Sequence, residues 1–164
     1  MIMIRVLVTG GTIDDIDYGS AGDAPESHES LIPGLLKRAR VGAEYTVEVL
    51  MARDSRFVTD EDRELILERC MECAEERILI THGTFTMPDT AKFLGKRDIE
   101  KTIVLFGSAI PANKEGSDAL FNLGAALMAV QLLPAGVYVI MNGRAFSWDN
   151  VRKNLETGYF ERED

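Results

Sequence analysis

Short apolar runs alternate with segments of helical periodicity along the chain. Runs rich in Val, Ile and Leu predict β-strands over Ile4–Val8, Tyr45–Met51, Arg77–Thr81, Lys101–Phe106 and Gly136–Met141. Apolar residues at helical spacing predict helices over Asp60–Glu76, Met87–Leu94 and Asp118–Leu132. Strands that are apolar on both sides, each followed by a helix, predict an α/β fold. We expect a single domain over residues 1–164, with an open, mostly parallel sheet and helices on both faces.

The ends of these predicted strands carry small and polar residues. In open α/β sheets, ligands bind beyond the carboxyl ends of the strands. Those ends are Thr9–Thr12, Ala52–Arg56, Thr81–Thr84, Gly107–Ala109 and Asn142-Gly143. The connection Asp14–Gly34 is long and rich in Gly, Asp and Ser, which is typical of a lid or of a disordered loop. The polar tail Asp149–Phe160 is expected to be ordered, because it is anchored by Trp148, Val151, Leu155 and Phe160.

Charge narrows the classes of partner. The 164 residues include 27 acidic and 18 basic side chains, for a net charge of −9. This balance argues against nucleic acid and against an anionic membrane surface as partners, because both are bound through Lys and Arg. The apolar start Met1–Val8 contains Arg5 and does not resemble a signal peptide, so we expect a cytoplasmic protein.

Cys70 and Cys73 form a C-x-x-C pair in a predicted helix, and the chain has no second Cys/His pair that would complete a zinc site. Both thiols are therefore predicted to face the core, and no metal or cofactor is expected. The segment Thr9–Ile13 matches neither the G-x-G-x-x-G nor the P-loop pattern, which argues against a nucleotide site. Two Gly-Thr pairs at strand ends, Gly11-Thr12 and Gly83-Thr84, are the strongest candidates for chemistry, because a threonine hydroxyl can act as a nucleophile.

Five segments resemble, in order, those of the bacterial-type L-asparaginase family. Thr9–Ile13 and Thr81–Met87 resemble the signatures TGGTI and THGTDTM. The other three similar segments are Asp54–Asp60, Gly107–Leu123 and Asp149–Asn154, of which the last two resemble GAMRP…ADGPFNL and DVTKTN. The resemblance covers nearly the whole chain and implies the N-terminal domain of that family, with its smaller C-terminal domain absent.

The resemblance also implies roles for individual residues. Thr12 corresponds to the nucleophile that forms an acyl-enzyme, and Thr84 and Lys153 to the pair that activates it. Ser55 corresponds to the residue that binds the substrate α-carboxylate, and the backbone at Gly11, Gly83 and Ser108 to the surroundings of the side-chain amide. Asp14, Asp15 and Tyr18 lie where the family carries its lid.

Three positions depart from the family pattern. Phe85 stands where the family has the aspartate that binds the substrate ammonium and supports the lysine. Arg56 replaces a glutamine, and Ile110 an arginine. The lost negative charge could come from Asp14, Asp15 or Asp17, and Asp118 could instead support the lysine.

The principal hypothesis is a cofactor-free amidohydrolase that converts L-asparagine to L-aspartate and ammonia. The alternatives are a broader amidase or glutaminase, and a non-catalytic module that binds a small amino acid. A homodimer or larger homo-oligomer is expected, because a second copy could cover the exposed rim of the site. Thr84 could also serve only as a helix cap, and His82 is predicted to be a structural histidine rather than a general base.

Overall fold

A computed structural model describes residues 1–164, and a six-stranded sheet of order β2-β1-β3-β4-β5-β6 lies at its centre. The first five strands are parallel to their neighbours, and β6 pairs antiparallel with β5. The strands are β1 (Met3–Gly10), β2 (Glu44–Arg53), β3 (Arg77–Thr81), β4 (Thr102–Phe106), β5 (Gly136–Met141) and β6 (Arg144–Ser147). The predicted single α/β domain with a mostly parallel sheet is confirmed.

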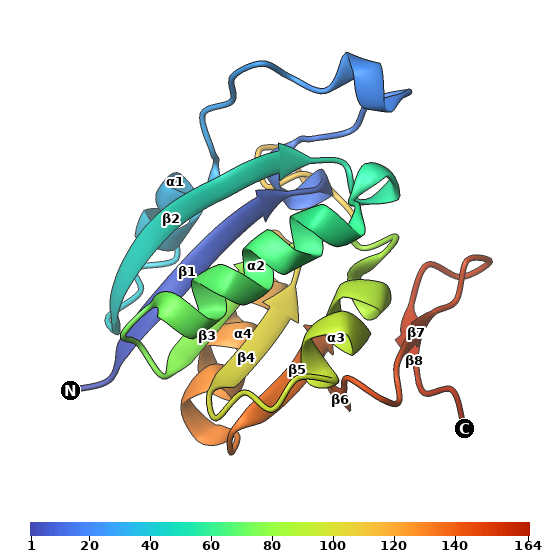
Figure 1. Ribbon diagram of the computed structural model, residues 1–164. Helices are drawn as coiled ribbons and strands as arrows, with labels where there is room; N and C mark the ends of the chain where they lie inside the picture. The colour runs from blue at the N-terminus through green and yellow to red at the C-terminus, as the bar shows by residue number, and fades with distance from the viewer.

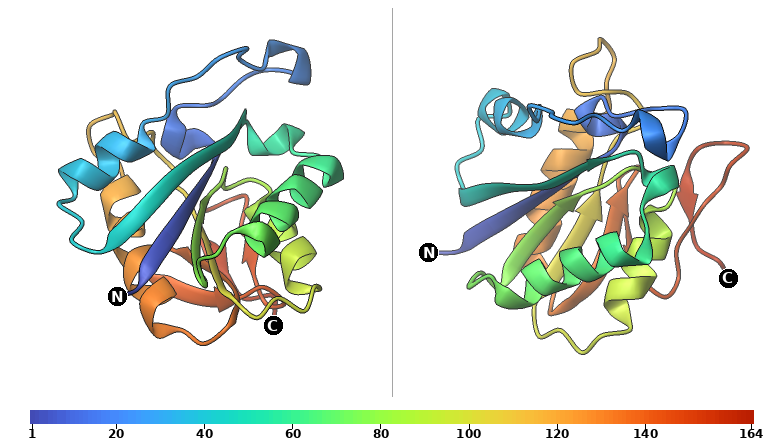
Figure 2. Two further views of the ribbon diagram at one scale, coloured as in Figure 1. Left: turned by 60° about the vertical axis from the view of Figure 1, so that its left-hand side comes forward. Right: turned by 45° about the horizontal axis from the view of Figure 1, so that its top comes forward.

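Helices cover both faces of the sheet (Figures 1 and 2). On one face, α2 (Asp60–Glu72) and α3 (Met87–Gly95) pack against alternate strand residues such as Ile78 and Ile80. On the other, α1 (Ile32–Arg38) and α4 (Ala119–Leu132) pack against the residues between them, such as Leu79. Because successive strand residues point to opposite faces, each apolar strand supplies both cores.

Helix α1 lies partly inside the connection Asp14–Gly34, which the sequence predicts to be a loop. The expectation that the connection runs without regular structure from Asp14 to Gly34 is wrong, since α1 begins at Ile32. Ile32, Leu35 and Leu36 are buried, with the i, i+3, i+4 spacing of a helix. This helix has seven residues, too few for its period to stand out in the sequence. The connection also contains two short 3-10 turns, Thr12–Asp14 and Ala21–Asp23.

The cysteines lie in the core, as predicted, although the helix that carries them is shorter than expected. Helix α2 starts after the N-cap Thr59, which forms a capping box with Asp62, and ends at Glu72 rather than Glu76. Cys73 already has an extended backbone, which turns the chain toward β3. Both thiols are buried and free, and burial raises the pKa of Cys70 to about 12, so its reactive thiolate form is suppressed.

The C-terminal residues form a small hairpin, β7 (Arg152–Lys153) with β8 (Phe160–Glu161), that stands beside α3 (Figure 1). Val151 and Phe160 anchor it in the core, as expected. The expectation that Leu155 also anchors the tail is wrong, because Leu155 is exposed. The sequence analysis missed this hairpin and β6, both of which are short. The hairpin carries Lys153 to the sheet.

Candidate active site

The carboxyl ends of β1 and β3 lie side by side at one edge of the sheet (Figure 1). The two Gly-Thr pairs, Gly11-Thr12 and Gly83-Thr84, follow these strand ends. Gly11 is so close to the neighbouring strand end that a Cβ atom on it would lie 2.3 Å from the backbone nitrogen of Gly83. Its φ of 83° also lies in the left-handed region that favours glycine. Thr12 follows directly, at the start of a 3-10 turn, and is partly exposed. The backbone thus places Thr12 beside the Gly83-Thr84 pair.

Ser55, in the turn that follows β2, lies next to Gly83. A Cβ atom on Gly83 would lie 2.5 Å from both Cβ and Oγ of Ser55, so glycine is required for this approach. Ser55 Oγ accepts a 3.3 Å hydrogen bond from the Thr86 backbone N–H, and the Ser55 carbonyl accepts a 2.6 Å bond from Thr86 Oγ1. Gly83 therefore contacts both Gly11 and Ser55. The resemblance assigns all three residues to substrate binding.

The β7–β8 hairpin brings Lys153 to Thr84. Lys153 Nζ donates a 2.8 Å hydrogen bond to Thr84 Oγ1, across 69 residues of sequence. Burial of the half-buried lysine holds its pKa below the ordinary value, with no compensating carboxylate. The N-cap position of helix α3 is Thr86, which makes no capping hydrogen bond through its side chain, so the interpretation of Thr84 as a helix cap is wrong. The predicted pair of hydroxyl and amine is present in the folded chain.

The first acids of the connection after Thr12 have different environments. Asp14 is fully buried, and its Oδ1 accepts hydrogen bonds of 2.5 Å from Leu31 N and 3.2 Å from Ser30 Oγ. His28 Nε2 lies 3.4 Å from the same oxygen. Asp15 is exposed, and its Oδ2 accepts a 3.2 Å bond from Asn113 Nδ2. Asp14 therefore holds the returning end of the connection, while Asp15 stays on the surface.

The outgoing part of the connection is held against the Ser55 turn. Tyr18 N donates to Asp54 Oδ2 at 3.2 Å, and the Tyr18 ring stacks on Phe57 with 5.3 Å between centroids. Arg56 Nη2 lies 2.5 Å from carboxylate oxygens of both Asp17 and Asp54. Although burial alone would raise the pKa of Asp54, the hydrogen bonds from Arg56 and Tyr18 hold it below its ordinary value. The predicted lid residue Tyr18 is thus packed on Phe57 with its hydroxyl unpartnered.

Asp118 and Ser108 order the loop after β4. The Asp118 carboxylate accepts 3.0 Å hydrogen bonds from the backbone N–H groups of Ala109 and Ile110, and a 2.9 Å bond from Asn122. Ser108 is buried and donates a 2.6 Å bond to the Ile110 carbonyl. Asp118, one possible supporter of the lysine, is engaged by this loop instead.

Phe85 follows Thr84 and is 49% exposed, although it is a large apolar residue. It lies in the turn Thr84–Thr86 that leads into α3. It offers an apolar surface where an acid would offer charge. No metal-binding group of three or more His, Cys, Asp or Glu side chains is present in the chain.

Sequence reasoning missed the contacts of Arg56 with Asp17 and Tyr18, in the connection that follows Thr12. It identifies Arg56 only as a departure from the family and assigns no role to Asp54. The available signal was the Asp-Ser-Arg run at a strand end, but the partners Asp17 and Tyr18 lie 36 to 39 residues away.

Comparison with known proteins agrees with this geometry. The family described as "Asparaginase, N-terminal" matches residues 3–159. A glutamyl-tRNA(Gln) amidotransferase subunit of Methanococcus vannielii is 32% identical over 161 residues, which cover 94% of this chain and 37% of the relative. A glutaminase-asparaginase of Pseudomonas fluorescens is 30% identical over 173 residues, which cover 96% of this chain and 48% of the relative.

Solved structures have the same fold. The thermostable L-asparaginase from Thermococcus kodakarensis superposes with a TM-score of 0.81 and 28% identity, covering 98% of this chain and 51% of that one. The chain therefore spans about half or less of the length of the proteins that it matches. With its strand-end glycine and threonine pairs, its Lys153–Thr84 contact and a match over residues 3–159, the chain belongs to the asparaginase family through the N-terminal domain of that family.

Proposed function

We propose that the protein is an amidohydrolase that converts L-asparagine to L-aspartate and ammonia through an ester on Thr12. The observation that carries the proposal is the hydrogen bond between Lys153 Nζ and Thr84 Oγ1, beside the Gly11-Thr12 strand end. A lysine whose pKa is lowered by burial loses its proton more readily and can then accept one from a hydroxyl.

The proposed reaction has two steps. Thr12 Oγ1 attacks the carbon of the side-chain amide while its proton passes to the Thr84–Lys153 pair. The pair then gives that proton to the amide nitrogen, the C–N bond breaks, and ammonia leaves an aspartyl ester on Thr12. Water then attacks the resulting ester, releasing aspartate and restoring the threonine hydroxyl. The backbone at Gly11, Gly83 and Ser108 surrounds the amide, where N–H donors stabilise the oxyanion, and Ser55 binds the α-carboxylate.

A broader amidase or glutaminase is the second candidate, and Phe85 favours it. An apolar residue at this position provides no charge for the substrate ammonium, so selection for amides that carry an α-ammonium is weaker. The names of the relatives, a glutaminase-asparaginase and an amidotransferase subunit, are compatible with this range. A small-amino-acid-binding module without catalysis is the third. The cytoplasm stays the predicted compartment.

An ammonia-release assay separates these candidates. Purified protein is incubated with L-asparagine, L-glutamine and succinamic acid, which lacks the α-amino group. We expect the highest kcat/KM with asparagine. Equal values for all three amides would support the broader amidase, and binding without release of ammonia from any of them would support the non-catalytic module.

We expect Asp15 to be the loop acid that binds the substrate ammonium. Asp14 is buried and already accepts hydrogen bonds from Ser30 and Leu31. Asp15→Asn should raise KM for asparagine about tenfold and change kcat less, since a charge-assisted hydrogen bond contributes about 1.5–3 kcal/mol. Asp14→Asn should lower the melting temperature, because it alters a buried acceptor of several hydrogen bonds. It should raise KM only indirectly, by loosening the connection that carries Asp15.

Steady-state kinetics and melting curves of both variants test this expectation, with the exposed loop variant Asp23→Asn as the control. A wild-type KM in both Asp14→Asn and Asp15→Asn would exclude the loop acids as the ammonium partner. That result would favour the broader amidase.

We also propose that the protein forms a homodimer or a larger homo-oligomer. Helix α4 has no charged residue, and its outer side exposes Leu120, Phe121, Met128 and Leu132. None of the helices combines the length and the apolar composition that a membrane span requires. Light scattering at micromolar concentration should give a particle larger than the 18.2 kDa chain. Met128→Glu should yield monomers and Lys37→Glu should not, whereas a wild-type particle of monomer size would refute the assembly.

A further inference from the structure

A chain of three hydrogen bonds runs beneath the strand-end cluster, from α2 to the backbone next to Thr84. Arg63 Nε donates a 3.0 Å bond to Thr90 Oγ1. Thr90 Oγ1 lies 2.8 Å from His82 Nε2, and His82 Nδ1 lies 2.7 Å from the Gly83 carbonyl oxygen. Thr90 and His82 are completely buried. The predicted structural histidine is thus fully partnered, and its partner is the backbone of the candidate site.

The proton positions in this series of hydrogen bonds follow from the groups at its two ends, the Gly83 carbonyl and the Arg63 guanidinium. The Gly83 carbonyl can only accept, so His82 Nδ1 carries the hydrogen. Burial lowers the pKa of His82 to about 4, so the ring is neutral near pH 7 and its Nε2 accepts. Thr90 must then donate to Nε2 and accept from Arg63, whose guanidinium can only donate. One tautomer and one hydroxyl orientation satisfy every bond.

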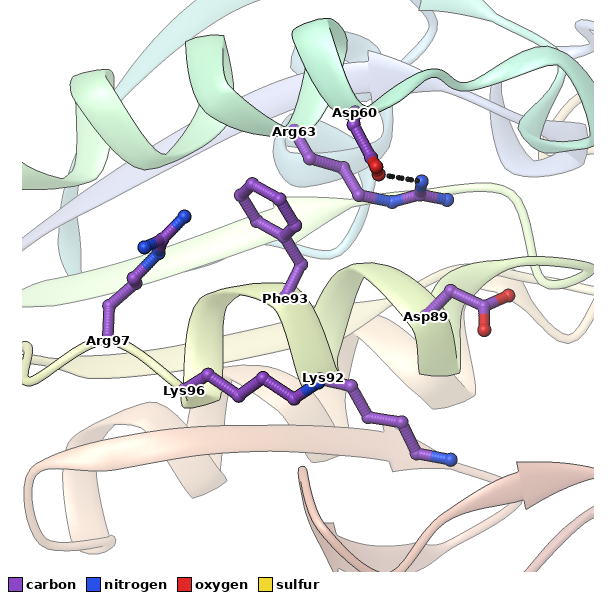
Figure 3. A pocket seen from close by; sticks show the side chains of 7 residues that line it. All are labelled: Asp60, Arg63, Asp89, Lys92, Phe93, Lys96 and Arg97. Carbon is purple, nitrogen blue, oxygen red and sulfur yellow. Dashed lines mark hydrogen bonds and ion pairs between the residues drawn. The ribbon is translucent and has the colours of Figure 1, made fainter.

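The outer end of the chain is held at the surface. The Arg63 side chain is only 11% exposed, and its Nη1 pairs with Asp60 at 3.0 Å. Figure 3 shows this pair at the edge of a hollow between α2 and α3, with Phe93 beside it. The guanidinium therefore has a partner on each side, Asp60 at the surface and Thr90 in the interior.

At its inner end, the hydrogen-bond chain reaches the peptide group between Gly83 and Thr84. In a trans peptide the carbonyl and the following N–H point in opposite directions. Holding the Gly83 carbonyl therefore also fixes the direction of the Thr84 N–H, which donates no backbone hydrogen bond within the chain. On one side of this peptide, Gly83 contacts Gly11 and Ser55. On the other side, Thr84 Oγ1 accepts the hydrogen bond from Lys153 Nζ.

We propose that Arg63, Thr90 and His82 are positioning residues, which set the plane of the Gly83–Thr84 peptide so that the Thr84 N–H faces the developing oxyanion and the Thr84 hydroxyl faces Lys153. The proposal rests on the proposed amidohydrolase function. None of the three residues touches the reacting atoms. Their effect is expected on the rate of the chemical step and not on substrate binding, because donors to an oxyanion act mainly in the transition state.

Substitutions of Thr90 test the proposal. Thr90→Val keeps the shape of the side chain but breaks the series of hydrogen bonds. It should lower kcat for asparagine about 10- to 100-fold, because small misplacements of catalytic groups have effects of this size. KM should stay within about threefold of the wild-type value. Thr90→Ser keeps the hydroxyl and should restore kcat to within about threefold of wild type.

Thr102→Val is the matched control. Thr102 is also a buried threonine that accepts a hydrogen bond from an arginine, Arg77, but it lies at the opposite end of the sheet. It should lower the melting temperature without lowering kcat. Equal losses of kcat in Thr90→Val and Thr102→Val, or an unchanged kcat in Thr90→Val, would overturn the proposal and leave the amidohydrolase function intact.

A second readout does not depend on activity. Nitrogen-15 NMR of the histidine ring near pH 7 should show His82 with hydrogen on Nδ1 in the wild-type protein, and a changed Nε2 resonance in Thr90→Val. Hydrogen on Nε2 in the wild-type protein would overturn the proposal directly. If the wild-type protein releases no ammonia from any amide, the proposed function fails, and the positioning role fails with it.

Discussion

Replacing Thr12 by alanine is expected to lower the rate of ammonia release by at least about 10⁴-fold, because removal of a nucleophile abolishes the covalent route. Thr12 follows Gly11, which lies against Gly83 where the ends of β1 and β3 run side by side, and it is partly exposed at the start of a 3-10 turn. The free energy of unfolding should change by no more than about 0.5 kcal/mol, as for most partly exposed positions. The measurement is steady-state ammonia release together with a melting curve.

Two controls accompany this variant. Thr12→Ser retains a hydroxyl and should keep measurable turnover. Thr46→Ala makes the same substitution in β2, near the amino end of the sheet, and should keep wild-type activity. More than about a tenth of wild-type activity in Thr12→Ala would remove Thr12 from the role of nucleophile, since a covalent mechanism cannot bypass its nucleophile at that rate.

The second large effect is expected at Lys153. Lys153→Met should lower kcat about 10²- to 10⁴-fold, the range for loss of a general base, because Thr84 loses the amine that accepts its proton. Lys153→Arg should be similarly inactive, since a guanidinium stays protonated throughout the accessible pH range. Lys37→Met, on the exposed side of α1, is the matched control and should behave as wild type.

The pH dependence of kcat/KM is a further test of Lys153 as the general base. Burial lowers the pKa of Lys153 below its ordinary value of 10.5, so the neutral amine forms at lower pH than in a free lysine. The kcat/KM of the wild-type protein should rise with pH up to that lowered pKa. The unfolded chain holds this proton more tightly than the folded chain, so stability should also rise with pH between the lowered pKa and 10.5. A rate that falls over this range would refute the base role.

Much of the fold could be predicted from the sequence because its strands are buried on both faces. Runs such as Arg77–Thr81 and Gly136–Met141 have the same bounds in the structure as in the prediction. Long elements with a strong pattern are recognised because many residues agree on one period. The misses were short or local: α1 has seven residues, β7 and β8 have two each, and the end of α2 depends on the backbone conformation of Cys73.

The sequence by itself determined the α/β layers, the edge at which the glycine and threonine pairs gather, and the family to which the chain belongs. These follow from local apolar patterns and from residue types at strand ends, which do not depend on distant parts of the chain. Only the tertiary structure decided which side chains meet there. It joined Lys153 to Thr84, buried Asp14, tied Arg56 to Asp17, and connected Arg63 through Thr90 and His82 to the Gly83 carbonyl. Such contacts join residues far apart in sequence, and their burial and pKa shifts arise only when the packed core excludes water.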